Sequence, residues 1–215
     1  MVAALVLVLV AMASGCRDGG SDDPDIPDGP EIDPTGWQLT VYYTPVERYH
    51  EGEPRPVVGC LRADSDCESD LGTYPGDFVD AVELEGNGRV TSGPQAGLVL
   101  NWTEDDGFWL DTAPRDSAGG VLRAFVTASA DPDVLPKATG FRVEDCGRAA
   151  DGTDVADEVC TRVAAAEWTI GVPFAPNRGG AKHVDIYVGD ESSPEFTQSG
   201  WYTTLVGAEL SLQND

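Results

Sequence analysis

Short apolar or alternating runs, each broken by glycine or proline, limit this chain to few architectures. From Trp37 onward the sequence contains nine such runs: residues 39–44, 57–61, 97–102, 107–110, 121–127, 140–143, 167–171, 184–188 and 205–212. Strands this short, at this density of turn residues, are typical of a closed β architecture. We therefore predict a mostly β fold.

Two segments have a helical pattern instead. In residues 75–84, Phe78 and Val82 lie four apart on one side, and Gly86 follows as a stop signal. Asp154 is a candidate N-cap for a second helix. The apolar residues of that helix are spaced four apart: Val155, Val159 and Val163. We expect one or two short helices beside the strands.

The N-terminus has the pattern of an export signal. Residues 2–12 are all apolar, and three small residues lead from them to Cys16. A bilayer span takes about twenty apolar residues, so this run is too short to be one. Small residues before a cysteine resemble a bacterial lipobox, and ordinary cleavage without a lipid is the alternative. We predict a lipoprotein signal peptide over residues 1–15 and lipidation of Cys16.

Acidic residues outnumber basic ones by 38 to 13, which gives a net charge of −25. A surface of this sign repels polyanions, so we predict no nucleic-acid binding and no attraction to anionic lipid. Residues 16–36 hold seven of the carboxylates together with proline and glycine, a composition typical of an extended, self-repelling tether. The remaining residues, 37–215, are expected to form one domain.

Five cysteines are an odd number, and removing Cys16 leaves four. In an exported protein an even set indicates disulfides, and four cysteines allow three connectivities. We expect the two short local pairs, Cys60 with Cys67 and Cys146 with Cys160. Zinc is the competing use, but neither spacing fits a zinc knuckle and the two histidines are far apart in the sequence. We predict no metal and no cofactor.

Two of the predicted strands divide into an apolar and a polar face, because alternate side chains of a strand point to opposite sides. The aliphatic side of residues 183–188 belongs in a core. Its other side, directed to a cleft or to solvent, carries His183, Asp185 and Tyr187. In residues 39–44 the polar side carries Thr40, Tyr42 and Thr44.

The same strands carry motifs of a known family. Residues 42–46 read Tyr-Tyr-Thr-Pro-Val, residues 183–189 read His-Val-Asp-Ile-Tyr-Val-Gly, and residues 199–202 read Ser-Gly-Trp-Tyr. Two further segments lie upstream of residues 183–189. These are residues 177–181, which read Asn-Arg-Gly-Gly-Ala, and residues 130–136, which contain Asp-Pro and Leu-Pro. In this order the motifs resemble the membrane-bound lytic murein transglycosylase A family with its three-aspartate domain. The resemblance covers both ends of residues 37–212.

The resemblance implies a six-stranded double-psi β-barrel with a small inserted subdomain at about residues 60–120. It places the catalytic acid on Asp185 and the two other aspartates of the pattern on Asp131 and on position 177, where this chain has asparagine. The residues expected to bind the sugar are Tyr42, Thr44, Asp131, Asn177, His183 and Trp201. The implied protein is a monomer that acts on peptidoglycan or another cell-wall glycan. It is held by its lipid on the outer face of a bacterial membrane.

Cleaving a glycosidic bond requires an acid that protonates the leaving oxygen. A lytic transglycosylase manages with one carboxyl, which gives its proton and then accepts one from the C6 hydroxyl of the same N-acetylmuramic acid. That hydroxyl closes on C1 to form a 1,6-anhydro sugar. Because the acid must stay protonated near neutral pH, burial or negative neighbours must raise its pKa.

Other interpretations of the same residues stay open. Asn177 in place of an aspartate, and a shorter stretch before Asp185 than in the family, favour a barrel that kept the scaffold and lost activity. Such a barrel would bind peptidoglycan or a protein partner without cleaving anything. Taken alone, Asp185 is equally explained as a solvent-facing strand residue paired with Lys182 or Arg178.

Overall fold

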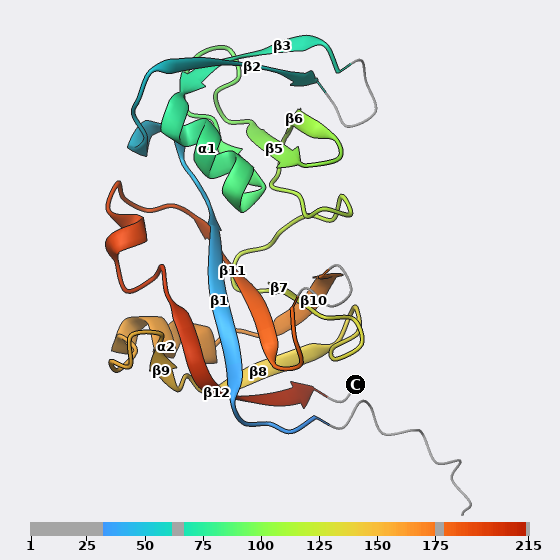
Figure 1. Ribbon diagram of the computed structural model, residues 1–215, viewed down its shortest axis with the longest axis vertical. Helices are drawn as coiled ribbons and strands as arrows, with labels where there is room; N and C mark the ends of the chain where they lie inside the picture. Colours follow the sequence, from blue (N-terminus) through green and yellow to red (C-terminus); the bar gives the residue numbers. More distant parts are fainter. Residues whose placement is uncertain (1–31, 62–66, 175–178, 214–215) are drawn as a thin grey trace, which may run out of the picture.

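The computed structural model describes residues 32–61, 67–174 and 179–213. Six of the described strands close a ring, in which each strand is hydrogen-bonded to the next and the last returns to the first (Figure 1). In ring order these are β1 (Trp37–Thr44), β11 (His183–Asp190), β7 (Thr127–Ala130), β10 (Trp168–Pro173), β8 (Gly140–Asp145) and β12 (Thr204–Gln213). The short strand β9 (Arg148–Ala149) adds to β12.

The interior of the ring is a hydrophobic core built from alternate strand residues. Leu39 on β1 and Val184 and Ile186 on β11 are fully buried there, beside large residues such as Trp168 on β10. The predicted apolar face of β1 and β11 is therefore confirmed. On the predicted polar face, Thr44 and Tyr187 near the ends of the strands are buried as well. Strands β1 and β11 run parallel, with Thr40 opposite Asp185, so their polar faces lie side by side.

A second sheet of five strands lies beside the ring and has its own core. Its strand order is β3 (Ser69–Pro75), β2 (Pro54–Cys60), β6 (Gly107–Asp111), β5 (Val99–Thr103) and β4 (Asn87–Arg89). All five come between β1 and β7 in the chain, so this sheet overlaps the predicted insert at about residues 60–120. It begins earlier, at Pro54.

The first predicted helix is present as α1 (Gly76–Glu85), which packs Phe78 and Val82 into the core of the second sheet. Gly86 ends the helix in the left-handed conformation, with φ 81°, and its N–H donates to the carbonyl of Val82 over 2.8 Å. This is the stop that the sequence predicted. The turn fixes Glu85 as the last residue of α1, where the helix meets β1.

The second predicted helix is present but starts later than expected. α2 (Asp157–Ala164) buries Val159 and Val163 and is preceded by Ala156, with no side-chain cap. Asp154 was predicted as the N-cap; it pairs instead with Arg148 at 2.9 Å. The short helices η1 (Glu47–Tyr49) and η2 (Phe196–Gln198) complete the described helical structure. In the described ranges no helix is long and apolar enough to cross a bilayer.

One predicted strand is largely wrong. Residues 121–127 contribute only Thr127 to β7. The preceding residues form a turn, in which the N–H groups of Val126 and Thr127 both donate to the carbonyl of Arg123, over 3.1 and 2.9 Å. The Thr127 hydroxyl accepts the N–H of Arg123 over 2.9 Å. This local hydrogen bonding outweighs the apolar pattern of the segment.

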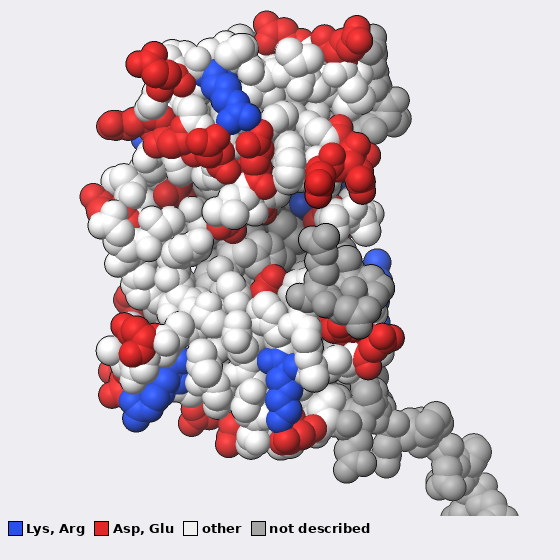
Figure 2. Space-filling model, viewed as in Figure 1, with Lys and Arg blue, Asp and Glu red and all other residues white. Residues whose placement is uncertain are grey.

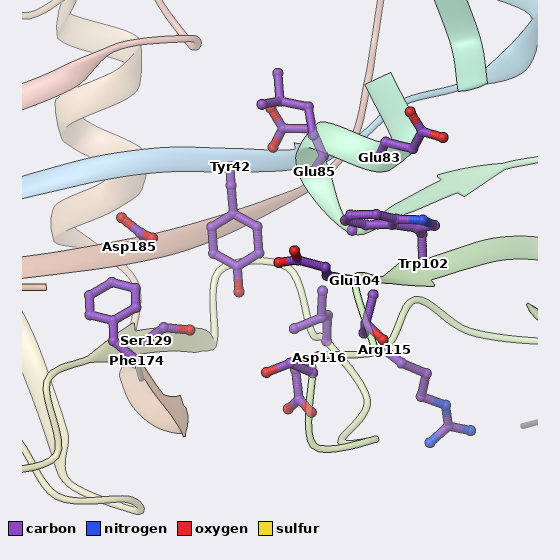
Figure 3. Close-up of a pocket in the computed structure, with 15 residues that line it drawn as sticks. Tyr42, Glu83, Glu85, Trp102, Glu104, Arg115, Asp116, Ser129, Phe174 and Asp185 are labelled. Carbon is purple, nitrogen blue, oxygen red and sulfur yellow. The ribbon is translucent and has the colours of Figure 1, made fainter. Parts of the chain in front are cut away.

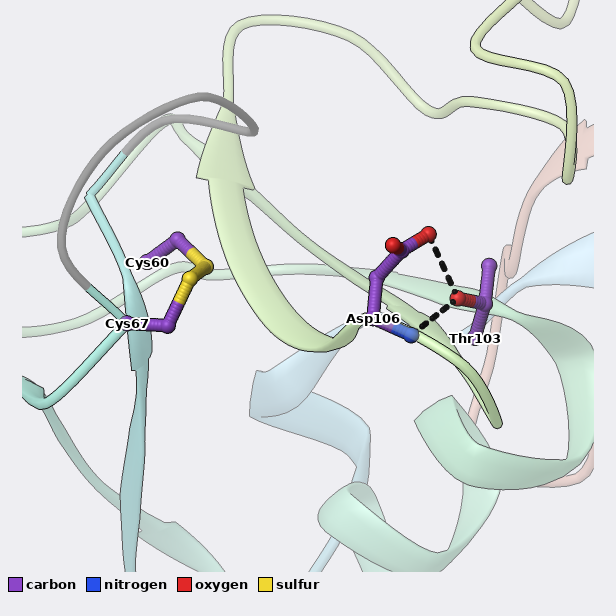
Figure 4. The surroundings of a disulfide bond; sticks show 4 residues. All are labelled: Cys60, Cys67, Thr103 and Asp106. Atoms are coloured by element: carbon purple, nitrogen blue, oxygen red, sulfur yellow. Dashed lines mark hydrogen bonds between the residues drawn. A yellow bond between two sulfur atoms is a disulfide. The ribbon is translucent and has the colours of Figure 1, made fainter.

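Both predicted disulfides are present. Cys60 with Cys67 joins the end of β2 to the start of β3, close to the β5–β6 hairpin (Figure 4). Cys146 with Cys160 joins the end of β8 to α2. The tip of the hairpin is closed by the Thr103 hydroxyl, which donates to the Asp106 carboxylate over 2.9 Å. Two disulfides are typical of proteins that fold in an oxidising compartment outside the cytoplasm.

Candidate active site

A cavity of about 420 Å³ lies where the ring meets the second sheet. In the space-filling view a hollow is visible at this level, with carboxylates on its rim (Figure 2). The lining residues labelled in Figure 3 are Tyr42, Glu83, Glu85, Trp102, Glu104, Arg115, Asp116, Ser129, Phe174 and Asp185. The two walls of the cavity therefore come from different sheets.

The ring supplies one wall through its polar faces. Tyr42 on β1, Ser129 on β7 and Asp185 on β11 line the cavity. Asp185 is opposite Ser129 across the β11–β7 pair and opposite Thr40 across the β1–β11 pair. Asp185 therefore stands on the central strand of three, on the face that the sequence assigned to a cleft or to solvent.

The Asp185 carboxylate is partly shielded. Its side chain is 29% exposed, which leaves it accessible from the cavity. Its Oδ1 atom is buried and, among the described residues, accepts no hydrogen bond of good geometry. Nε2 of His183 lies 3.1 Å from that oxygen. Lys182, one of the two partners considered from the sequence, instead binds Asp33 at 2.6 Å.

A hydrogen bond at Nδ1 holds the His183 ring in one orientation. Nδ1 lies 3.0 Å from the carbonyl oxygen of Gly179, and since a carbonyl only accepts, Nδ1 carries a hydrogen. Nε2 lies 3.0 Å from the Thr40 hydroxyl, which donates to it when the ring is neutral. The nearby Asp185 carboxylate raises the pKa of His183. The protonated ring therefore forms an ion pair with Asp185.

The second sheet supplies the opposite wall, from the end of α1 and the end of β5. Glu85 is prominent there: burial raises its pKa to about 7, and the negative charge of Asp185 acts in the same direction. The N–H of Tyr43 donates to Oε2 of Glu85 over 3.4 Å and opposes the shift. Glu85 is thus a carboxyl that keeps its proton close to neutral pH.

Glu85 was not predicted as a site residue. The sequence indicated only that a helix stops at Gly86, and no motif marks the residue before that stop. Trp102, Ser129 and Phe174 were missed for the same reason: each lies in an ordinary strand or at its end, and only the packing of the two sheets brings them to one cavity.

Tyr42 projects into the cavity, and in the view of Figure 3 its ring lies between Asp185 and the Glu85 side of the site. Burial raises the pKa of the Tyr42 hydroxyl, and a hydrogen bond with Ser129 acts against the shift. The hydroxyl is therefore a neutral hydrogen-bonding group at every relevant pH. Its ring centre is 5.2 Å from that of Tyr187.

Three residues predicted to bind the sugar lie elsewhere. Thr44 is fully buried and hydrogen-bonds with Asn87 and Tyr187. Asp131 is 6% exposed and accepts the N–H of Asp133 over 3.0 Å, in a turn. Trp201 packs edge-on against Phe125. The described lining of the cavity includes none of the three.

Two other predicted residues, Asn177 and Cys16, lie outside the described residues. His183 lies next to Asp185 and is not among the residues that line the cavity in the described ranges. Within the described ranges, no group of three histidine, cysteine or acidic residues has the arrangement of a metal site.

The cavity is strongly acidic. Five of its described lining residues are carboxylic acids: Glu83, Glu85, Glu104, Asp116 and Asp185. Arg115 also lines it, but its guanidinium pairs with Asp111 at 3.0 Å.

No protein-family model matches the chain, and no curated protein matches it. Solved structures do. Escherichia coli MltA with bound chitohexaose has a TM-score of 0.52 at 14% identity, over 82% of this chain and 72% of that one. A second structure of E. coli MltA has a TM-score of 0.47 at 12% identity, over 84% and 72%. LtgG, a lytic transglycosylase of Burkholderia pseudomallei, has a TM-score of 0.42 at 11% identity, over 83% and 73%. The chain has an MltA-like fold.

Proposed function

We propose that this protein is a lytic transglycosylase of the cell wall. It cleaves peptidoglycan glycan strands and leaves 1,6-anhydro-muramic products. The observation that carries the proposal is Asp185, accessible from an inter-sheet cavity and with a buried oxygen that lacks a good hydrogen bond. The MltA-like fold supports it, since a structure of that fold holds chitohexaose.

One carboxyl at Asp185 is enough for both steps of the reaction. It protonates the leaving oxygen as the bond from that oxygen to C1 breaks. The C6 hydroxyl of the same sugar then bonds to C1 and returns a proton to the carboxylate. His183 is the ion-pair partner of Asp185. The Tyr42 hydroxyl is placed to form hydrogen bonds with hydroxyl or acetamido groups of the sugar.

The indole of Trp102, at the end of β5, offers an aromatic face for a sugar ring. Asn177 remains a proposed sugar ligand because of its place in the motif. Thr44, Asp131 and Trp201 lie away from the cavity, so we assign them no contact with the glycan.

The proposed location follows from the N-terminal sequence. The signal peptide of residues 1–15, the lipid on Cys16 and the acidic tether together put the domain near the wall. The tether ends before the predicted Gly36, because Ile32 packs against the core of the ring, Asp33 pairs with Lys182 and the Pro34 carbonyl accepts the N–H of Leu210. A tether of this length reaches up to roughly 60 Å from the bilayer. The two disulfides agree with export. We also retain the double-psi topology as part of this proposal.

The test is product analysis. Purified mature protein is incubated with peptidoglycan, and 1,6-anhydro-muropeptides are measured by mass spectrometry. We expect Asp185→Asn to lower their rate of formation at least about 100-fold, the usual contribution of an acid–base group. Glu209→Gln, an exposed change on β12, is the control. Absence of anhydro products from the wild type, or an unchanged rate for Asp185→Asn, contradicts the proposal.

Asn177 favours a second candidate, a glycan-binding barrel without activity. In that case insoluble cell wall retains the protein in a sedimentation assay, and no anhydro product forms. Failure of both retention and turnover removes both candidates.

A further inference from the structure

We propose that the peptide stem of the substrate binds in a side groove on the ring, next to the cavity that takes the sugar. The inference rests on the proposed function and deepens it, since the stem is the branch that peptidoglycan carries on its muramic residues. The side groove consists of two hollows of about 170 and 480 Å³, which share Tyr202, Thr203 and Thr204. The larger hollow lies where the loop between β9 and α2 faces the start of β12 (Figure 1).

A row of polar residues connects Asp185 to the side groove. Thr40 on β1 lies opposite Asp185 on β11, and Thr204 on β12 lies opposite Thr40. Residues opposite each other on paired strands point to the same face. Their chain neighbours Leu39 and Leu205 are fully buried in the core, so the three polar side chains face outward in line. Because neighbouring strands are about 4.8 Å apart, Thr204 stands roughly 10 Å from Asp185.

Tyr202 stands where the side groove borders the cavity. Its ring is 38% exposed and packs edge-on against the ring of Tyr43, with the ring centres 5.6 Å apart. Burial raises the pKa of the Tyr202 hydroxyl, and the charge of Glu85, a lining residue of the cavity, acts in the same direction. A ligand held at Asp185 therefore has a path along the ring into the side groove.

The substrate determines where the stem begins. In the proposed reaction C1 and the C6 hydroxyl of one muramic residue meet Asp185, and the same sugar carries the stem on the lactyl group at C3. The stem thus leaves the sugar within one ring width of Asp185. Four stem residues span about 13 Å when fully extended, which is enough to pass Thr204 and enter the larger hollow. The glycan itself occupies the inter-sheet cavity, so the side groove is left for the branch.

The lining of the larger hollow suits a peptide. Peptide N–H and C=O groups both need partners, and the hydroxyls of Thr203 and Thr204 can donate as well as accept. Tyr202 is the single aromatic residue in the described lining, so a further sugar ring would find no second platform for stacking. Small residues leave space for a chain beside them: Ala149, Ala150, Ala156 and Gly200.

The end of the groove beyond β12 offers a carboxylate to the amine of the stem. The third stem residue is a diamino acid, whose side chain keeps a free amine where the stem is not cross-linked. Asp151 lines the larger hollow, and its carboxylate accepts the hydroxyl and the N–H of Thr153 over 2.6 and 2.9 Å. These bonds hold the pKa of Asp151 below its ordinary value. Asp154 is paired with Arg148, so Asp151 is the proposed partner of the amine.

The experiment measures kcat and KM for anhydro-product formation by the mature protein on three uncrosslinked glycan substrates. The first has complete stems with a free amine, the second has stems shortened to their first residue, and the third has complete stems with an acetylated amine. For the wild type we expect a KM about tenfold higher on the second substrate than on the first, with the third between them. We expect the same kcat on all three, the pattern of an interaction made equally in the ground state and the transition state.

A substitution that fills the groove tests the location. A Cβ added at Gly200 would lie 3.3 Å from Cβ of Ala156, so the Ala156 side chain points across the groove toward Gly200. Ala156→Trp should raise KM on the first substrate to the value that the wild type has on the second, and leave KM on the second unchanged. The matched control is Val206→Trp, an exposed position on β12 outside both described linings, which should behave like the wild type.

A second variant keeps the shape of the groove and removes its polar groups. The double variant Thr204→Val, Asp151→Asn lacks one hydroxyl and the carboxylate charge. We expect it to raise KM on the first substrate by at least about threefold and to abolish the difference between the first and third substrates. Its control is Glu209→Gln, which removes an exposed charge elsewhere on β12.

The outcomes are distinct. If the wild type forms no anhydro product on any substrate, the proposed function fails and this inference fails with it. If the wild type has one KM for all three substrates, only the inference is overturned. A wild-type preference for stems that Ala156→Trp leaves intact overturns it as well, because the stem then binds elsewhere. Equal rises in KM on the first and second substrates would assign the groove to sugar and contradict the inference. If Ala156→Trp does not fold, an unchanged KM in the double variant has the same effect.

Discussion

Glu85 is a carboxyl in surroundings that oppose its ionisation, and this costs the folded protein free energy. Its pKa is raised from an ordinary value of 4.5 to about 7 in the fold. Below about pH 4.5 it is protonated whether the chain is folded or not. Between these two values only the folded chain holds the proton, so this residue makes the fold less stable as the pH rises. Above about pH 7 the penalty is constant.

We expect Glu85→Gln to remove this dependence. Compared with their difference at pH 4, the variant should gain on the order of 2 to 3 kcal/mol of unfolding free energy over the wild type at pH 8. The measurement is urea unfolding followed by tryptophan fluorescence at several pH values. Asp80→Asn should show no such gain. Parallel stability curves for the wild type and Glu85→Gln would show that Glu85 titrates normally.

At the same scale, the sequence identified Asp185 but not Glu85. Asp185 was predicted from the motif of residues 183–189, and the alternation of its strand places it on the polar face. Glu85 was not, since it lies far from Asp185 in the chain and no local pattern distinguishes it from Glu83. Such residues come to line one cavity only after two sheets have packed.

Among the elements, α1 is the one whose end determines the site. Its last turn carries Glu83, Leu84 and Glu85, and the left-handed Gly86 sets where the chain leaves the helix. Space is not the constraint at Gly86, because an added Cβ would meet only the Trp102 carbonyl oxygen at 3.7 Å. The constraint is the backbone angle.

We therefore expect Gly86→Ala to destabilise the protein by about 1 kcal/mol, the usual cost of a side chain in this conformation. Thermal unfolding measures it. Gly93→Ala is the comparison for a positive φ in an open loop, with nothing near the added Cβ. If Gly86→Ala also changes the pH dependence of stability that Glu85 causes, while Gly93→Ala does not, the end of α1 positions the Glu85 carboxyl. Identical profiles would argue against that role.

Element prediction succeeded where periodicity was strong and failed where it was absent. β3 reads Ser-Asp-Leu-Gly-Thr-Tyr-Pro and buries only Leu71 and Tyr74, three positions apart, because the register shifts within its pairing with β2. β4 has three residues, Asn-Gly-Arg, and none of them has an apolar side chain. Neither strand has an alternating pattern to detect. Residues 121–126 have the pattern but form a turn, held by local hydrogen bonds that no apolar count reveals.

For the molecule as a whole, one of the two disulfides joins elements that no sheet pairing connects. Cys146 with Cys160 ties α2 to the ring, across a separation of 14 residues. We expect the double variant Cys146→Ser, Cys160→Ser to lose about 3 kcal/mol of unfolding free energy, from the chain entropy that the bond removes. Urea unfolding with and without reductant measures it. Equal stability of the oxidised wild type and the variant would contradict this account.

The ring closes through the pairing of β12 with β1, whereas the second sheet leaves the ring after β1 and returns to it before β7. One excursion of the chain thus carries an entire wall of the cavity. Residues can be added to or removed from that excursion without shifting the register of any ring strand. The width of the cavity opening therefore depends on a segment that can vary in length while Asp185 stays in place.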